Sequence, residues 1–522
     1  MELQLPSFQV LLSILLVSFF IFRSLKKSKP KNPDLKPIPG PRKFPVIGNL
    51  HQIASPSPHK TLRDLALKHG PLMHLQLGEI STVIVSSPEV AKEVTKTHDI
   101  NFSYRPAMEV PRVYTYDFTN IAFAPYGNYW RFLRKLCNTE LLTASRVQSF
   151  RSIREAEVLN LVKTIHVSEG EPVNLSDMIF SMTYGIVARA AFGKKCKDQQ
   201  TYIDSITELT KLLSGFSLSD FYPSIKPLQL FSGMKTKVEK MHKENDKIIA
   251  NIIAEHRERR VREKSGQAEA EQEDLVDVLL RIQEENEFPL ADKNIKSVIV
   301  TSLFSIENFM LAFQDVFGAG SETSSTTVEW ALSEMIKNPW VMKEAQAEVR
   351  RVFGPKGNVD ETGLHELKYL KAVIRETFRI RPSVPLLLPR ECHQACEING
   401  YHVPEKTRVL INAWALGRDP NYWNEPDKFN PERFLNGSVD YTGTNYEFIP
   451  FGAGRRMCPG ITFATPNLEL PLAQLLFHFD WKLPNGMKGE DLDMSEVFGM
   501  TVKRKTDLVL IPTPYHGSKI VH

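Results

Sequence analysis

The sequence predicts a mainly α-helical fold with a small β subdomain, preceded by one N-terminal transmembrane helix. Three observations support this prediction. Helical periodicity dominates most of the 522 residues, short extended segments gather near the start, and the first residues form a long apolar run. No repeat of about 20 to 50 residues is visible, which argues against a solenoid of stacked units.

The N-terminus predicts an uncleaved membrane anchor. Leu5 to Phe22 is nearly continuous in apolar residues and as a helix would reach about 27 Å, close to the thickness of a bilayer core. The main alternative, a cleaved signal peptide, would carry positive charge before the apolar run, but here Glu2 precedes the run and the basic cluster 23–31 follows it. The positive-inside rule then leaves the rest of the chain in the cytosol, and membrane lipid is an expected partner.

After the anchor, no linker or change of composition divides the chain. We assign residues 1–25 to the anchor, 26–45 to a basic and proline-rich hinge, and 46–518 to one large folded domain. Hydrophobic residues make up 42% and charged residues 24% of the sequence, so we expect a large buried core. The net charge of +4 is small for this length, and we therefore expect no nucleic-acid partner.

Within the domain, extended segments come first and helices follow. Leu72 to Leu77 and Val83 to Val85 predict a β-hairpin, and Pro88 opens a helix. The charged stretch Arg257 to Asp274 is interpreted as solvated helix end and loop. Long helices are expected at 126–163, 234–260, 274–286, 294–335, 339–353 and 364–380.

The strongest functional signal is the segment Phe451 to Gly460, which reads FGAGRRMCPG. Its glycines permit a tight backbone path beneath a flat ligand, and Cys458 is presented at the start of a helix. We expect the helix N-terminus and the nearby arginines to lower the pKa of Cys458. A lone buried cysteine is more often an inert core residue, but such a thiol would not need this density of Gly and Arg.

This segment resembles the haem-binding loop of the cytochrome P450 superfamily at every defined position of the family pattern. The resemblance implies a haem-thiolate catalytic domain over 46–518 with haem b as cofactor, Cys458 as the axial ligand of the iron, and Phe451, Gly452 and Gly460 in the haem loop. It also implies insertion of one oxygen atom of O2 into a substrate. Electrons would come from NADPH through NADPH–cytochrome P450 reductase, at the endoplasmic reticulum membrane.

Two further motifs match the same family. Glu376 and Arg379 fit its Glu-x-x-Arg helix, and Arg433 supplies the third member of a structural triad. Glu348 and Arg351 also fit Glu-x-x-Arg, because such pairs are common on helices, but order and spacing ahead of the cysteine favour the first pair.

The sequence 319–323 resembles the oxygen-activation motif of the family's central helix. Thr323 would steer protons and Glu322 would be the acidic member of the relay. From the residues alone, a helix weakened by Gly320 with a back-bonding threonine is the plainer interpretation.

Other positions match residues that bind the haem carboxylates or line the substrate pocket. Arginine suits the first task because its planar fork binds a carboxylate through two hydrogen bonds. The expected carboxylate ligands are Trp130, Arg134, Arg390 and Arg456. The expected pocket residues are Phe118, Ala319, Val384, Leu387 and Met500.

Finer details look like the plant A-type group (71 clan) of microsomal monooxygenases. The runs 124–127, 384–391 and 478–483 carry that similarity, and 120–134 with 147–151 look most like terpenoid-oxidising subfamilies. The resemblance therefore implies an apolar small-molecule substrate, a sesqui- or diterpene.

One departure from the family is an insertion at 301–314, where the pattern would run almost directly from 299 to 315. As helix it would add about 21 Å, so we expect part of it to bulge outward. Our hypothesis is that 300–314 is retained intron or alternative splice product, since Val codons begin with GT and a Gln codon can be CAG. The alternatives to an active enzyme are a haem-binding but catalytically impaired isoform and a peroxide-rearranging enzyme that needs no reductase. The pair Glu322 and Thr323 argues against the last.

Overall fold

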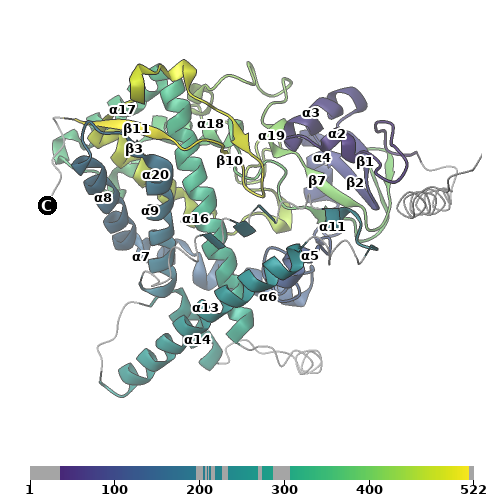
Figure 1. Ribbon diagram of the computed structural model, residues 1–522, viewed down its shortest axis with the longest axis horizontal. Coiled ribbons are helices and arrows are strands. Elements are labelled where there is room, and N and C mark those ends of the chain that lie inside the picture. Colours follow the sequence, from purple (N-terminus) through teal and green to yellow (C-terminus); the bar gives the residue numbers. More distant parts are fainter. Residues whose placement is uncertain are drawn as a thin grey trace, which may run out of the picture.

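One long helix runs through the middle of the molecule and organises the rest. In the computed structural model this helix is α16 (Ile306–Lys337), and Figure 1 shows it crossing the centre. It packs against α9 (Leu175–Phe192), α18 (Lys368–Ile380) and α20 (Ile461–His478), and these contacts bury the main hydrophobic core.

The structure describes most of the chain. The predicted anchor, residues 1–25, lies outside the described residues. Within the described part, no helix combines the length and apolar content needed to cross a membrane. The described residues are 36–194, 204–205, 208–209, 211–212, 218–225, 233–267, 273–285 and 306–515, with the backbone alone for 283–285 and 306–317.

Further helices surround this centre, with α13 and α14 below it and α2, α3 and α4 beside the largest sheet (Figure 1). They are α2 (Leu50–Ile53), α3 (Pro58–His69), α4 (Pro88–Lys92), α5 (Glu109–Tyr114), α6 (Asn128–Leu136), α7 (Ala144–Ser149), α8 (Arg151–Val167), α11 (Leu218–Phe221), α13 (Met234–Lys264), α14 (Leu275–Glu285), α17 (Pro339–Phe353) and α19 (Ala413–Leu416). The mainly α class predicted from the sequence is confirmed.

The strands form small sheets at the edges of the helical body. The largest has the order β1-β2-β7-β4, in which β1 and β2 are the predicted hairpin, with Leu72 opposite Val85. The others are β3-β11-β8, β9-β10 and β5-β6. The strands are β1 (Leu72–Leu77), β2 (Ile80–Val85), β3 (Val173–Asn174), β4 (Arg390–Glu391), β5 (Cys396–Ile398), β6 (Tyr401–Val403), β7 (Arg408–Ile411), β8 (Phe479–Lys482), β9 (Glu496–Val497), β10 (Lys503–Arg504) and β11 (Val509–Pro514).

The predicted helices at 234–260, 274–286 and 339–353 are confirmed as α13, α14 and α17. The helical stretch expected over 126–163 is divided in the structure into α6, a π-helical turn, α7 and α8. One break is caused by capping: the Thr143 hydroxyl accepts a hydrogen bond from the backbone N–H of Arg146 and starts α7. Hydrophobic periodicity does not register such a cap.

The described part of the insertion forms the start of the central helix, α16. Residues 306–314 continue α16 without a break, so the expected bulge does not fall there. Residues 294–305, which include the first part of the insertion, lie outside the described residues.

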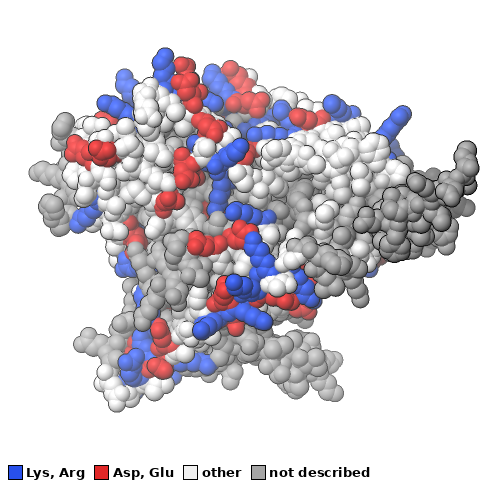
Figure 2. All heavy atoms as spheres, viewed as in Figure 1, with Lys and Arg blue, Asp and Glu red and all other residues white. Residues whose placement is uncertain are grey.

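The interpretation of 257–274 as solvated holds at its exposed start but is wrong at its last residue. Asp274 is 3% exposed, and its carboxylate lies 2.8 Å from Nε2 of His256 and 3.4 Å from Nη2 of Arg259. These contacts join the end of α13 to the start of α14. Elsewhere on the surface, Figure 2 shows acidic and basic side chains interleaved on the face viewed.

Candidate active site

A large internal cavity lies against the middle of α16. Its volume is about 330 Å³. Pockets for small molecules are usually about 300 to 1,000 Å³, so this cavity is of the size that binds such a ligand. Its walls come from α16, the start of α20, the segment 383–390 and the loop 450–460.

The loop 450–460 holds Cys458 at one wall of the cavity. The backbone N–H of Cys458 donates to the carbonyl of Phe451 at 2.9 Å, and the N–H of Gly460 donates to the Cys458 sulfur at 3.3 Å. Gly454 has φ +71°, and a Cβ there would lie 2.1 Å from the carbonyl oxygen of Thr95. The loop can therefore pass so close to its neighbour only with glycine at this position.

Cys458 lines the cavity, and its side chain is accessible to a ligand there. Burial raises the pKa of this thiol, and the N–H of Gly460 and the charge of Arg134 oppose that effect only in part. The expectation of a lowered pKa is thus wrong for the protein alone, because desolvation outweighs both. A bound metal cation would displace the proton, since thiolate is the form that ligates metals.

A cluster of buried cations forms the wall beside the cysteine. Nε of Arg456 donates to the carbonyl of Ser103 at 2.7 Å, and Nη2 of Arg390 donates to that of Ala453 at 2.7 Å. Burial, then the charges of Arg390 and Arg134, lower the pKa of Arg456 to about 9. Asp99 compensates part of this charge, with its Oδ1 3.5 Å from Nη1 of Arg390, and the remaining buried positive charge is costly without a further anion.

All four predicted carboxylate ligands line this cavity. Arg134 donates to the carbonyl of Met457, and the Trp130 indole N–H donates to that of Ile121 at 3.0 Å. The prediction missed Arg105, which donates to the carbonyls of Leu388 and Pro389 at 2.9 and 2.7 Å. Burial lowers the pKa of Arg105, as do the charges of Arg456 and Arg390. One arginine before a proline carries no distinctive signal in a sequence.

This set of donors fits haem. A buried thiol can ligate the iron, and the cations beside it can neutralise two carboxylates. The apolar side chains of the cavity, among them Phe378, Phe463 and Leu468, suit a flat macrocycle. The ring of Phe451 packs edge-on against that of Phe378, with centroids 5.0 Å apart.

On α16 the two predicted relay residues also line the cavity, but their side chains point to different partners. The Thr323 hydroxyl donates to the carbonyl of Ala319 at 2.6 Å. Glu322 is 1% exposed, and its Oε1 lies 2.6 Å from Nζ of Lys503 on β10. No sequence pattern indicated this lysine.

The structure brings Glu376, Arg379 and Arg433 together behind the cavity. Arg379 holds both carboxylate oxygens of Glu376 at 2.7 Å, and Nε of Arg433 lies 3.1 Å from Oε1. The rival Glu348 has another task, because its carboxylate accepts the backbone N–H groups of Tyr369 and Leu370 at the start of α18.

Four of the five expected substrate-pocket residues line the cavity, and one does not. The four are Ala319, Val384, Leu387 and Met500. Phe118 is half-buried and is not among the described lining residues, so its place in the substrate pocket stays a prediction. Tyr116, Asp117 and Phe118 all have positive φ, which turns the chain just before Asn120 and Ile121 reach the wall.

Comparison with known proteins agrees with this geometry. The cytochrome P450 family model matches residues 38–510, and the chain therefore belongs to the cytochrome P450 family of monooxygenases. A haem iron cofactor is implied by that membership.

Similar plant proteins align over nearly their whole length. Cytochrome P450 71D10 of Glycine max is 54% identical, covering 96% of this chain and 96% of the relative. Tabersonine 16-hydroxylase 1 of Catharanthus roseus is 52% identical, covering 97% and 98%. Premnaspirodiene oxygenase of Hyoscyamus muticus is 49% identical, covering 97% and 99%.

A solved structure of a zebrafish cytochrome P450 with abiraterone shares the fold. Its TM-score is 0.71 at 26% identity, and the alignment covers 88% of this chain and 99% of that one.

Proposed function

We propose that this protein inserts one oxygen atom of O2 into an apolar terpenoid, a sesqui- or diterpene, using electrons from NADPH delivered by NADPH–cytochrome P450 reductase. We further propose that residues 1–25 anchor it in the endoplasmic reticulum membrane with the catalytic domain in the cytosol. The observation that carries the proposal is one cavity containing the thiol of Cys458, a cluster of buried arginines and an apolar lining.

In this proposal the part of the cavity next to Cys458 binds haem, and the wall formed by α16 contacts the substrate. Haem bound against Cys458 supplies the chemistry that activates oxygen. Arg134, Arg390, Arg456 and Trp130 hold its two carboxylates, exchanging backbone carbonyls for charge-assisted hydrogen bonds. The loop glycines keep side chains away from the sulfur.

Residues on α16 transfer protons, and apolar residues near α16 bind the substrate. The Thr323 hydroxyl, now bonded to the carbonyl of Ala319, is the donor that faces the reaction space. Glu322 is a carboxylate that can take up and release a proton next to it. Val384, Leu387 and Met500 exclude water and position an apolar molecule by contact alone.

Two relatives supply the substrate classes to test. By their names, one acts on premnaspirodiene and the other on tabersonine. An alkaloid is therefore the alternative to a terpenoid, and both compounds belong in the first panel.

The deciding experiment is a reduced carbon monoxide difference spectrum of the chain expressed without residues 1–22. A band at about 450 nm requires an intact thiolate-ligated haem, and we expect it. Product formation with reductase, NADPH and each compound of the panel then tests the substrate class. A band at about 420 nm, or none, in both the natural chain and a chain with Cys458→Ser would contradict the assignment of the thiolate ligand.

The second candidate function, a haem-binding but catalytically impaired isoform, rests on the insertion. Its residues 306–314 belong to the same helix as Thr323, so they can alter where the relay sits. Deleting residues 301–314 tests this: a large gain in product per haem supports the impaired isoform, and equal activity counts against it. Sequencing the transcript across 300–314 tests the splice hypothesis, which fails if every message carries the segment within one exon.

A further inference from the structure

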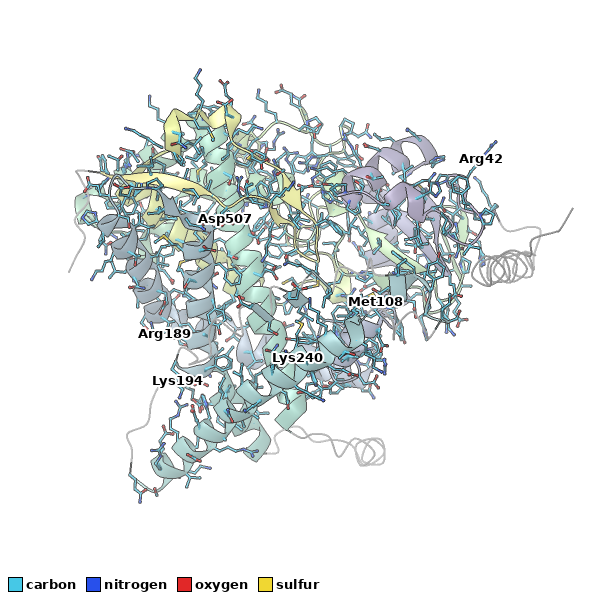
Figure 3. The ribbon with its side chains drawn as sticks, viewed as in Figure 1. Arg42, Met108, Arg189, Lys194, Lys240 and Asp507 are labelled. Atoms are coloured by element: carbon cyan, nitrogen blue, oxygen red, sulfur yellow. The ribbon has the colours of Figure 1, made fainter. Side chains whose placement is uncertain are left out.

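Two free cysteines, Cys392 and Cys396, face each other beside β4, the edge strand of the largest sheet. Their sulfur atoms are 4.0 Å apart. Cys392 directly follows β4, and Cys396 begins β5. Figure 3 places the largest sheet on the side of the molecule where Arg42 is labelled, away from Arg189 on α9. Neither cysteine is among the described residues that line the cavity, and no step of the proposed reaction uses them.

The side chain of Asn101 holds the loop between the two cysteines in a folded-back path. Its Nδ2 donates to the carbonyl of Gln394 at 2.8 Å, and its Oδ1 accepts the N–H of Gln394 at 2.7 Å. The backbone of Cys392 is fixed as well, because its N–H donates to the carbonyl of Thr407 at 2.9 Å and its carbonyl accepts the N–H of Lys406 at 2.7 Å. The folded backbone therefore keeps the two sulfur atoms in contact.

The two thiols differ in exposure and in acidity. Cys392 is 0% exposed and packs in an apolar cluster with Val403 and Val409, whereas Cys396 is half-buried at the margin of that cluster. The hydrogen bond from Cys392 lowers the pKa of Cys396, and the same bond, together with burial, raises the pKa of Cys392. Because the thiolate is the nucleophile, an oxidant that enters from solvent should react first at Cys396.

We propose that Cys392 and Cys396 form a redox-sensitive pair, which hydrogen peroxide converts to an intramolecular disulfide at a modification site separate from the candidate active site. The Cys396 thiolate attacks the O–O bond of the peroxide, so that an S–O bond forms, the O–O bond breaks, and hydroxide leaves as water with the proton that the thiol gave up. The Cys392 sulfur then attacks the sulfenic sulfur, so that the S–S bond forms, the S–O bond breaks, and a second water leaves with the proton of Cys392. Two electrons pass from the sulfur atoms to the peroxide, and two thiols and one H2O2 give one disulfide and two water molecules.

The bond requires only a local movement. A disulfide places its sulfur atoms about 2.05 Å apart, so the present distance of 4.0 Å has to close by about 2 Å, through rotation of the two side chains. The new bond would cross-link β5 to β4, which carries Arg390 of the cation cluster. Disulfides in a reducing cytosol are typically transient or redox-sensing, and we therefore expect this one to be readily reversed by a dithiol.

The first test maps thiols in the full-length, haem-loaded chain after exposure to hydrogen peroxide. Free thiols are blocked with iodoacetamide under denaturing conditions, disulfides are reduced, and the released thiols are labelled with N-ethylmaleimide. Trypsin should release residues 391–406 as one peptide that carries both cysteines. We expect this peptide to gain two maleimide labels together, while the buried Cys137 gains none, and to lose both when dithiothreitol is added before blocking. Absence of the paired labels, or equal labelling of Cys137, would overturn the proposal.

The second test separates the roles of the two thiols. In Cys392→Ser, peroxide should stop at the sulfenic acid of Cys396, which dimedone captures, and Cys396→Ser should give neither that adduct nor the disulfide. Cys392→Ala is the second variant at the buried position, in case the serine chain does not fold. Dimedone capture in Cys396→Ser and none in the variants at 392 would contradict the proposed order of attack. Neither readout needs turnover, so the result is independent of that for the proposed function.

Discussion

Glu376 and Glu322 are both buried carboxylates next to cations, but their surroundings differ. Glu376 is 0% exposed and is bound by Arg379, Arg433 and the N–H of Asn430. Glu322 is paired with Lys503, whose side chain is 30% exposed. A carboxylate whose cation partners are buried is held in place, whereas one whose cation reaches solvent lies within reach of water. The exposure of the cation partner therefore separates a locking group from a working one.

The largest expected effect is at the locking site. Glu376→Gln should leave the guanidinium of Arg379 buried without its charge partner and destabilise the fold by about 3 to 5 kcal/mol. Thermal unfolding and loss of the haem spectrum measure this. Arg351→Ala, at the exposed arginine of the second Glu-x-x-Arg sequence, is the control and should change stability by about 0.5 kcal/mol or less. Similar losses of unfolding free energy in the two variants would show that Glu376 does not stabilise the fold more than an exposed residue does.

Glu496 is a second buried carboxylate that is bound by cationic side chains, and its effect on stability should depend on acid pH. Burial alone would raise its pKa, but hydrogen bonds and charges from His59 and Lys60 outweigh burial and hold the pKa of Glu496 well below its usual range. Burial lowers the pKa of His59, so above neutral pH the compensating charge comes from Lys60, 2.7 Å away, and from Arg381, 3.6 Å away. A depressed carboxyl pKa contributes stability above the unfolded value and loses it as the pH falls.

We therefore expect wild type to lose about 1 to 2 kcal/mol more than Glu496→Gln on acidification from about pH 5 to 3, measured by urea unfolding. Equal acid sensitivity of the two proteins would show that Glu496 is not held ionised.

A smaller effect is expected at alkaline pH, where α13 meets α14. Burial opposes a charged ring at His256, but the hydrogen bond and charge of Asp274 raise its pKa above the ordinary value. A raised histidine pKa contributes stability below about pH 6.5 and loses it as the pH rises through the folded value. Hydrogen exchange in α14 should thus accelerate at high pH in wild type beyond the intrinsic rate. His256→Gln should show no such added dependence; if it does, another group is responsible.

The smallest effect on stability is expected at the working carboxylate. Glu322→Gln should change the free energy of unfolding by about 0.5 kcal/mol or less, because it removes a buried charge and the head of Lys503 can turn to water. Product per NADPH should nevertheless fall about tenfold. Calorimetry and coupled turnover measure the two quantities on one preparation. A large loss of stability would place Glu322 among the locking groups.

Much of the site could be predicted because its signals are local in the sequence. The loop 451–460 needs glycines for its backbone path and one cysteine for its chemistry, and both are visible within ten residues. Glu376 and Arg379 are one helical turn apart, so their contact follows from helix geometry. Arg433 lies further along the chain and was placed by family resemblance.

Other features depend on contacts that the sequence does not display. The backbone turns at 116–118 through three successive positive φ angles, which hydrophobic periodicity cannot predict. Arg105 reaches the cavity wall through carbonyl groups at 388 and 389, far along the chain. The predicted anchor at 1–25 and the first residues of the insertion remain predictions.

The sequence by itself determined the thiolate loop and the helical class, because those depend on residue type and on spacings of a few positions, and family resemblance placed four residues of the cation cluster. The pairing of Glu322 with Lys503, and the excess of desolvation over positive charge at Cys458, were decided only by tertiary structure. Residues from distant segments meet where helices and strands pack, and a group's burial depends on everything packed around it. Neither quantity can be obtained from the order of residues along the chain alone.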